Sequence, residues 1–415
     1  MTQAENQRRR RDLRYRRSPV VERLKQEETP AQVRRWWLGE LGFRQDPFSS
    51  GAVVAETDTL LSQTFTEDKL TFAALLDPYS SALCAPSGWG KTAYRLELAK
   101  TMATDHLMID YNLRPLVSHL PEVSLEDHLN HLLSSAGTAL LRHCFTKPGF
   151  FEGLDGENQG LIASFLDRFS PDWPQQLRWM DGLETAINDP AAKDLIQTLQ
   201  EQGPRLPQDL LPCVSYLRQI AGDSGFQGIR VMVDGVDGCA ETHRNPAAME
   251  KLLGNLWNTL DLFRFPGLAF KFFLPEEMTE SLLSSNGVGS RLITPVKAPR
   301  LTEYQLEALL STRCSFASGG LYPSFDALCD ESCYRDGRRL VWGVMARENT
   351  SRALLIAGDE IFRAHTIHLL DLPLEEQRKS TLLSREDMEN GLRAFDQRFP
   401  RPDTLPGQSS LPKQP

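Results

Sequence analysis

The sequence lacks several features that would place it in a specialised class of protein. No stretch comes near the roughly 18 uninterrupted apolar residues of a transmembrane helix. The arginines near the N-terminus are not followed by the apolar run of a secretory signal. Only seven of the 415 residues are cysteines. Their number is odd and none forms a Cys-x-x-Cys pair, which argues against a disulfide framework and a zinc site. We therefore expect no membrane contact and a protein of the reducing cytoplasm.

The signatures of several enzyme classes are missing as well. There is no H-E-x-x-H zinc motif, no G-x-S-x-G nucleophile motif and no set of kinase motifs. His128 and His131 lie three residues apart on an expected helix, where two surface histidines are a better interpretation than a metal pair. What remains is an ordinary globular composition, 40% hydrophobic and 24% charged. The length suggests two to three domains, or one large domain with an appendage.

Charge is distributed unevenly along the chain. Residues 1–35 hold 11 basic and five acidic side chains, whereas the whole chain has a net charge of −9. A basic tail on an acidic body suggests an anionic partner for the tail, such as the phosphate backbone of a nucleic acid. The alternative is a solvated arm without a specific target. We slightly favour the solvated arm, because Tyr15 is the only aromatic residue that accompanies the arginines.

The central part of the chain alternates between expected strands and expected helices. Short apolar runs predict strands at 80–84, 107–109, 229–233 and 268–274. Helical periodicity follows the first of these strands and also covers residues 125–141. Asn245 and Pro246 open a further helix as its cap and its first residue. This alternation predicts an α/β fold with a mainly parallel sheet.

The same patterns divide the chain into four parts. Residues 1–35 are expected to form a basic disordered tail, and residues 36–300 the core, with a helical insertion at about 112–225. Residues 301–395 are expected to form a helical lid or winged-helix-like domain. Its helices are predicted at 303–313, 324–333, 339–347, 352–368 and 385–395. The proline-rich residues 396–415 are expected to be disordered.

The strongest chemical signal is a glycine-rich loop between an expected strand and an expected helix. It consists of Ala85, Pro86, Ser87, Gly88, Trp89, Gly90, Lys91 and Thr92. This is the Walker A pattern with alanine in place of the first glycine. The glycines let backbone N–H groups converge on phosphate oxygens, Lys91 reaches the β- and γ-phosphates, and the Thr92 hydroxyl ligates Mg²⁺. We therefore expect this loop to bind ATP.

A second motif follows the strand predicted at 229–233. An apolar strand that ends in an aspartate is the Walker B arrangement, and Asp234 would hold Mg²⁺ directly or through water. Asp237, three residues further on, is a candidate for orienting or deprotonating the attacking water. Its alternative is a turn-forming aspartate beside Gly238.

These motifs resemble those of the AAA+ and STAND groups of P-loop ATPases. The Gly-Phe-Arg-Gln-Asp-Pro-Phe segment at 42–48 looks like the segment that lines the adenine pocket in AAA+ proteins related to secretion-pathway and origin-recognition ATPases. The Walker B run at 231–237 is similar to that of STAND ATPases, which act as nucleotide switches. The Asp-Gly-Arg-Arg-Leu run at 336–340 looks like the lid motif whose first arginine contacts the γ-phosphate, which maps to Arg338.

The resemblance implies a P-loop NTPase that couples Mg²⁺-ATP binding and hydrolysis to assembly with a protein, a second copy or a nucleic acid. Lys91, Asp237 and Arg338 would be its catalytic residues. Gly235 stands where an acidic residue usually follows the Walker B aspartate, so a nucleotide-gated scaffold with little hydrolysis remains an alternative. A nucleic-acid-binding loader is another, because of the basic tail and the origin-type resemblance. Arg291 and Arg313 are better interpreted as surface arginines than as fingers for a neighbour's γ-phosphate.

Overall fold

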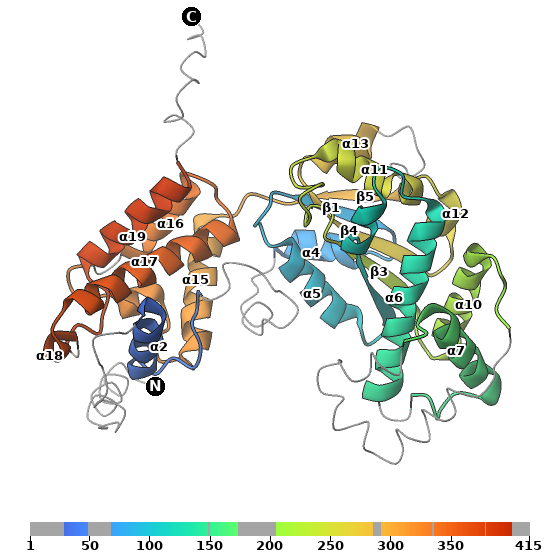
Figure 1. The fold of residues 1–415 in the computed structure, drawn as a ribbon, viewed down its shortest axis with the longest axis horizontal. Helices are drawn as coiled ribbons and strands as arrows, with labels where there is room; N and C mark the ends of the chain where they lie inside the picture. Colours follow the sequence, from blue (N-terminus) through green and yellow to red (C-terminus); the bar gives the residue numbers. More distant parts are fainter. Residues whose placement is uncertain are drawn as a thin grey trace, which may run out of the picture. The chain divides into compact units, whose positions relative to one another are not determined.

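The computed structural model describes residues 29–48, 68–147, 150–172, 205–284, 292–333, 336–377 and 379–400. These residues fall into two compact units (Figure 1). The sheet unit is formed by the described residues within 67–87 and 94–299, and the helical unit by the described residues within 1–66, 88–93 and 300–415. Most of the expected basic tail, the C-terminal tail from residue 401 and residues 173–204 of the expected insertion lie outside the described residues.

The sheet unit contains five parallel strands in the order β2-β3-β4-β1-β5. The strands are β1 (Ser81–Ala85), β2 (His106–Asn112), β3 (Gly228–Asp234), β4 (Leu268–Pro275) and β5 (Thr294–Lys297). In the ladder, Ala85 at the end of β1 is paired with Pro275, and Val233 near the end of β3 is paired with Phe272. The expected α/β architecture with a parallel sheet is confirmed.

Burial on both faces explains the sequences of the inner strands. Every residue of β1 and β4 is buried, and so is every residue of β3 except Asp234. A strand covered on both faces needs apolar residues at successive positions, not at alternate ones. Strand β5 has a single buried residue, Val296, and lies at the edge of the sheet. No apolar run marks β5, and we did not expect it from the sequence.

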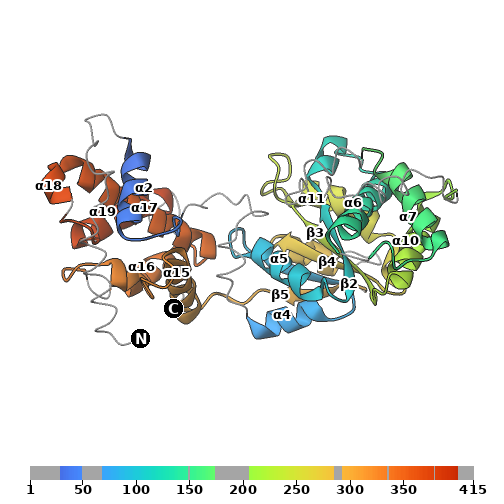
Figure 2. The ribbon, with the colours of Figure 1, turned by 90° about the horizontal axis from the view of Figure 1, so that it is seen from below.

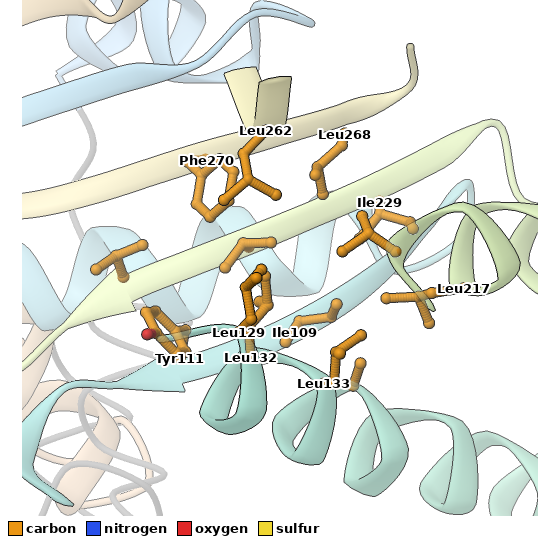
Figure 3. Close-up of a cluster of buried hydrophobic side chains, with 14 of the residues drawn as sticks. Ile109, Tyr111, Leu129, Leu132, Leu133, Leu217, Ile229, Leu262, Leu268 and Phe270 are labelled. Carbon is orange, nitrogen blue, oxygen red and sulfur yellow. The ribbon is translucent and has the colours of Figure 1, made fainter. Parts of the chain in front are cut away.

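Helices cover both faces of this sheet. They are α4 (Lys69–Leu76), α5 (Lys91–Met102), α6 (Leu125–Thr146), α7 (Gly156–Phe169), α10 (Leu210–Asp223), α11 (Pro246–Trp257), α12 (Leu260–Arg264) and α13 (Met278–Ser284). Leu129, Leu132 and Leu133 of α6 pack against Ile109 of β2 in the largest buried cluster (Figure 3). Helices α4 and α5 lie on the side of the sheet away from α6 (Figure 2).

The helical unit combines one N-terminal helix with the C-terminal helices. Its helices are α2 (Pro30–Glu40), α15 (Glu303–Ala317), α16 (Asp336–Met345), α17 (Ser351–Asp371), α18 (Leu374–Gln377) and α19 (Arg385–Arg398), with a 3₁₀ turn at Phe325–Leu328. The rings of Trp37 and Phe48 lie 4.9 and 4.7 Å from the Phe362 ring, both edge-on. Residues 30–48 therefore belong to the core of this unit, although we expected residues 36–48 to extend the sheet domain.

Helix α2 begins six residues before Trp36, where we expected order to start. Thr29 caps it, and the Thr29 backbone N–H donates to the Gln32 side chain over 2.8 Å. Pro30 occupies the first turn, where its missing N–H costs nothing. Arg34, which we counted in the tail, makes a 2.6 Å ion pair with Asp46. Local capping and this ion pair thus outweigh the disorder suggested by the arginine-rich composition.

Two further expectations for the C-terminal part need correction. The helix predicted at 324–333 is only the 3₁₀ turn Phe325–Leu328, followed by an isolated bridge between Cys329 and Leu383. No strand is found among the described residues of 301–395, so the winged-helix alternative has no support there. Separately, among the helices that the structure describes, none combines the length and the apolar content needed to cross a membrane.

Candidate functional site

The glycine-rich loop connects the end of β1 to the start of α5. Gly88 and Gly90 have φ angles of +80° and +124°, which only glycine adopts without strain. Left-handed residues within such a turn are typical of backbone nests that bind anions. Lys91 is the first residue of α5, so the loop ends at a helix N-terminus, which also favours anions.

Within the helical unit, the loop packs against the N-terminus of α17. The Arg352 N–H donates to the Gly88 carbonyl over 3.0 Å, and the Ser351 hydroxyl donates to the Trp89 carbonyl over 3.0 Å. The first N–H groups of a helix have no partner inside it, so the Gly88 carbonyl satisfies one of them. A Cβ added to Gly88 would lie 2.7 Å from the Arg352 Cβ. This side of Gly88 is therefore closed by α17.

The side chains of the loop differ in exposure. Trp89 and Lys91 are buried, with 4% and 7% of their surface exposed, and Thr92 is half-buried. Ser87 is exposed. Lys91 thus brings a buried ammonium group close to a helix N-terminus, and both favour negative charge.

Asp234 is the last residue of β3, on the edge of the sheet where β1 also ends. Its Oδ1 accepts a hydrogen bond from the Gly235 N–H over 2.8 Å, and its Oδ2 lies 3.2 Å from the Arg95 Nε. Arg95 is on α5 and also pairs with Asp110 of β2. The arginine side chain is only 6% exposed. No sequence motif marks Arg95 as part of this site.

Gly235 explains why no acidic residue follows Asp234. Its φ is +81°, and a Cβ there would lie 2.7 Å from the Asn112 Oδ1. A side chain at this position would need both a strained backbone and a displaced Asn112. The turn after β3 therefore requires glycine at this position.

Asp237 lies in that turn. The Gly238 N–H donates to the Gly235 carbonyl over 3.2 Å, which makes Asp237 the third residue of a four-residue turn. The side chain is half-buried. This position suits both interpretations of Asp237, a turn former and a group that orients water.

Arg338 is on the surface of the helical unit. It is the third residue of α16, its side chain is 65% exposed, and its Nε lies 3.1 Å from Glu307 of α15. The arginine that packs against the glycine-rich loop is Arg352. No motif signals Arg352, because its position depends on how α17 packs. The role proposed for Arg338 at the γ-phosphate stays a prediction.

The structure tests the interpretation as a surface residue for Arg313 but not for Arg291. Arg313 is buried and its Nε donates to the Pro47 carbonyl over 2.8 Å, so the surface interpretation is wrong for it. This bond fixes the 42–48 segment, which the resemblance linked to an adenine pocket. Arg291 lies outside the described residues.

Two histidine clusters have structural explanations. His128 is 1% exposed, so its interpretation as a surface residue is wrong. Its Nδ1 lies 2.7 Å from the Tyr111 hydroxyl and its Nε2 lies 2.9 Å from the Leu252 carbonyl. Burial lowers the pKa of His128 to about 4. In this buried network the neutral ring accepts from Tyr111 and donates to Leu252.

The second cluster ties α17 to α19. His365 and His368 of α17 direct their Nδ1 atoms at the two oxygens of Asp387, at 2.9 and 3.0 Å. Ser384 also donates to Asp387, from its backbone and its hydroxyl. Burial alone would raise the pKa of Asp387, but the hydrogen bonds and charge of His365 and the Ser384 bonds lower it to about 2. The Asp387 carboxylate therefore links α19 to α17 through its contacts with the two histidines.

Comparison with known proteins adds no assignment to this geometry. No family model matches the sequence, and no curated protein matches it. The function must therefore be inferred from the loop, the two aspartates and the arginines described above.

Proposed function

We propose that the protein is a P-loop ATPase of the AAA+/STAND type, which binds ATP with Mg²⁺ and couples the nucleotide state to assembly with a partner. One observation carries the proposal. A glycine-rich loop with two left-handed glycines follows β1, and an aspartate ends β3 on the same edge of a parallel sheet. In open α/β sheets, ligands bind outside the carboxyl ends of the strands.

The spacing of the strands supports this proposal. Only β4 lies between β1 and β3, so the ends of the two strands are about 10 Å apart, or two strand spacings. Helix α5 is continuous from Lys91 to Met102, and Thr92 lies one turn before Arg95. Since Arg95 contacts Asp234, the helix carries Thr92 towards the same edge.

The residues present suit Mg²⁺-ATP. The backbone at Gly88 and Gly90, the Lys91 ammonium and the N-terminus of α5 would bind the phosphates. The Thr92 hydroxyl and the Asp234 carboxylate are the oxygen ligands that Mg²⁺ prefers. When bound, Mg²⁺ would neutralise charge on the phosphates. Asp237 would orient or deprotonate the water that attacks the γ-phosphate in line.

Coupling to a partner would begin at α17. The Arg352 N–H depends on the Gly88 carbonyl, so a rearrangement of the loop on nucleotide binding would change the capping of α17. A helix that gains or loses contacts in this way is a two-state element that a ligand can bias. Arg338 would report the γ-phosphate only if it left Glu307. The partner would be a protein, a second copy of this chain or a nucleic acid.

The test of the nucleotide site is Lys91→Ala, with Lys100→Ala as its matched control. Lys100 lies on the same helix, is exposed and pairs only weakly with Glu97 at 3.5 Å. We expect Lys91→Ala to abolish tight ATP binding in calorimetry and Lys100→Ala to preserve it, with both variants folded by circular dichroism. Near-wild-type ATP affinity in folded Lys91→Ala would refute the Walker A assignment.

A second experiment separates an autonomous enzyme from a nucleotide-gated scaffold. Asp237→Asn should keep ATP binding and slow phosphate release, whereas Asp234→Asn should weaken the Mg²⁺ dependence of ATP binding itself. If Asp237→Asn hydrolyses ATP at the wild-type rate, Asp237 is only a turn residue. Hydrolysis that starts only when a partner is added would favour the nucleotide-gated scaffold. That outcome would agree with the glycine at position 235, where an acidic residue usually follows the Walker B aspartate.

The loader alternative is tested with DNA. Deletion of residues 1–28 leaves α2 and its cap intact, so it removes only the basic tail. If the tail binds DNA, the deletion should weaken the binding and flatten its salt dependence. An unchanged salt slope would exclude the tail as the contact, and absence of binding by both proteins would exclude the loader.

A further inference from the structure

We propose that Arg95 is a positioning residue that pairs with both Asp234 and Asp110, and that it releases Asp234 and keeps Asp110 when Mg²⁺-ATP binds. The inference rests on the proposed function and adds a regulatory step to the same site. Arg95 would set how much Mg²⁺ contributes to ATP affinity, because it competes with the metal for one carboxylate oxygen.

The geometry places Arg95 between two carboxylates. Its Nε lies 3.2 Å from the Asp234 Oδ2, and its Nη1 pairs with the Asp110 Oδ1. The Asp234 Oδ1 accepts from the Gly235 N–H. Each carboxylate oxygen of Asp234, the residue proposed to hold Mg²⁺, thus has a protein partner in this structure. A carboxylate oxygen paired with a guanidinium is a poorer ligand for a dication, since the two positive charges repel.

The release of Asp234 is possible because Asp110 keeps Arg95 paired. A buried guanidinium without a partner would be costly, and the Arg95 side chain is almost fully buried. Asp110 is more exposed than Asp234 and lies on the same face of the sheet, one strand away. Release of Asp234 therefore leaves the charge of Arg95 neutralised. Two acceptors on neighbouring strands give this side chain two defined partners.

The position of Arg95 on α5 links it to the nucleotide. Lys91 and Thr92 precede Arg95 by four and three residues, the spacings that place side chains on one helix face. Charge that arrives at Lys91 and Thr92 would therefore act on the helix face that carries Arg95. A purely structural explanation is that Arg95 only fastens α5 to the sheet, and the following experiment distinguishes the two.

The experiment compares Arg95→Met and Asp110→Asn with wild type. Calorimetry would measure the affinity for a non-hydrolysable ATP analogue twice, with saturating Mg²⁺ and with a chelator. The measured quantity is the ratio of the two affinities. We expect Arg95→Met to raise this ratio about three- to tenfold, and Asp110→Asn to lower it, because Arg95 would then pair with Asp234 alone.

Arg114→Met is the matched control. Arg114 donates to the Gly238 carbonyl in the turn after Asp234, so this variant removes one positive charge near the site without freeing Asp234. Its ratio should equal that of wild type. A fastening role would change the unfolding midpoint of Arg95→Met but would not move the ratios of the two variants in opposite directions.

The outcomes separate this inference from the proposed function. If wild type fails to bind the analogue in either condition, the proposed function is wrong and the inference falls with it. If wild type binds, and the ratio is unchanged or shifts in one direction for both variants, only the role of Arg95 is refuted. Asp110→Asn changes an exposed side chain, so the inference stays testable even if Arg95→Met does not fold.

Discussion

Acid should destabilise the sheet unit through His128. The ring is buried between α6, β2 and α11, and protonation would add a charge where the neutral ring accepts a hydrogen bond from Tyr111. The pKa of His128 falls from 6.5 to about 4 on folding, mainly because of burial. The unfolded chain therefore binds the proton more tightly, so stability is full above pH 6.5 and is lost as the pH falls towards 4.

The size of the effect follows from these two pKa values. Relative to pH 7, the free energy of unfolding should fall by about 2 kcal/mol at pH 5 and by about 3 kcal/mol at pH 4. Such a loss is a large fraction of the roughly 5–15 kcal/mol that stabilises a typical domain. Other histidines of the sheet unit have lowered pKa values, for example His131 and His143, so wild type alone does not isolate His128.

A pair of urea unfolding series isolates the contribution of His128. Wild type and His128→Gln would be unfolded at several pH values between 4 and 7 and followed by circular dichroism. Glutamine cannot take up the proton but still offers an amide to the Leu252 carbonyl. The difference in unfolding free energy between the two proteins should shrink by about 2 kcal/mol from pH 7 to pH 5. A difference that is constant across this range would refute the reasoning.

Two further predictions, one for each unit, can be checked by urea unfolding. The first concerns close packing in the helical unit, and the second concerns a buried lysine in the sheet unit. Gly391→Ala should cost the helical unit about 1–3 kcal/mol, because the new Cβ would lie 2.4 Å from the Ile361 Cα. The matched change Gly343→Ala, with its nearest neighbour at 3.6 Å, should be neutral or stabilise α16. In the sheet unit, burial and then the charge of Arg230 lower the pKa of Lys271 from 10.5 to about 7, so wild-type stability should rise from pH 7 to pH 10. Lys271→Met should lack that rise, and an equal rise in both proteins would contradict the assignment.

The sequence predicted the inner part of the sheet well because burial on both faces leaves a strong pattern. The strand expected at 229–233 is one residue shorter than β3 at each end, and the strand expected at 268–274 ends one residue before β4 does. Strand β5 could not be predicted in this way, since three of its four residues are exposed. Its identity as a strand comes from pairing with β1, which is a property of the folded sheet.

The residues of the candidate site also differ in whether a local sequence pattern marks them or only the packing of the fold places them. The glycine-rich loop and Asp234 could be found from the sequence, because the chemistry requires particular residue types at a fixed spacing. Arg95 and Arg352 could not, since a lone arginine carries no pattern and each depends on the packing of one helix. The Thr29 and Gln32 pair that caps α2 lies inside an arginine-rich stretch whose composition predicts a disordered tail, so we did not expect α2 to begin there.

The position of α2 has a consequence for how the chain is made. Its Trp37 donates to the Thr381 carbonyl, a residue 344 positions later. At about 5–20 residues per second, a ribosome would need roughly 20–70 s to synthesise the residues between them. During this interval the sheet unit, which apart from residues 88–93 is continuous from 67 to 299, can fold, while α2 exposes Val33, Trp37 and Leu38 without their final neighbours. We therefore expect ribosome-bound chains halted near residue 300 to depend on a chaperone at α2, and full-length chains to release it.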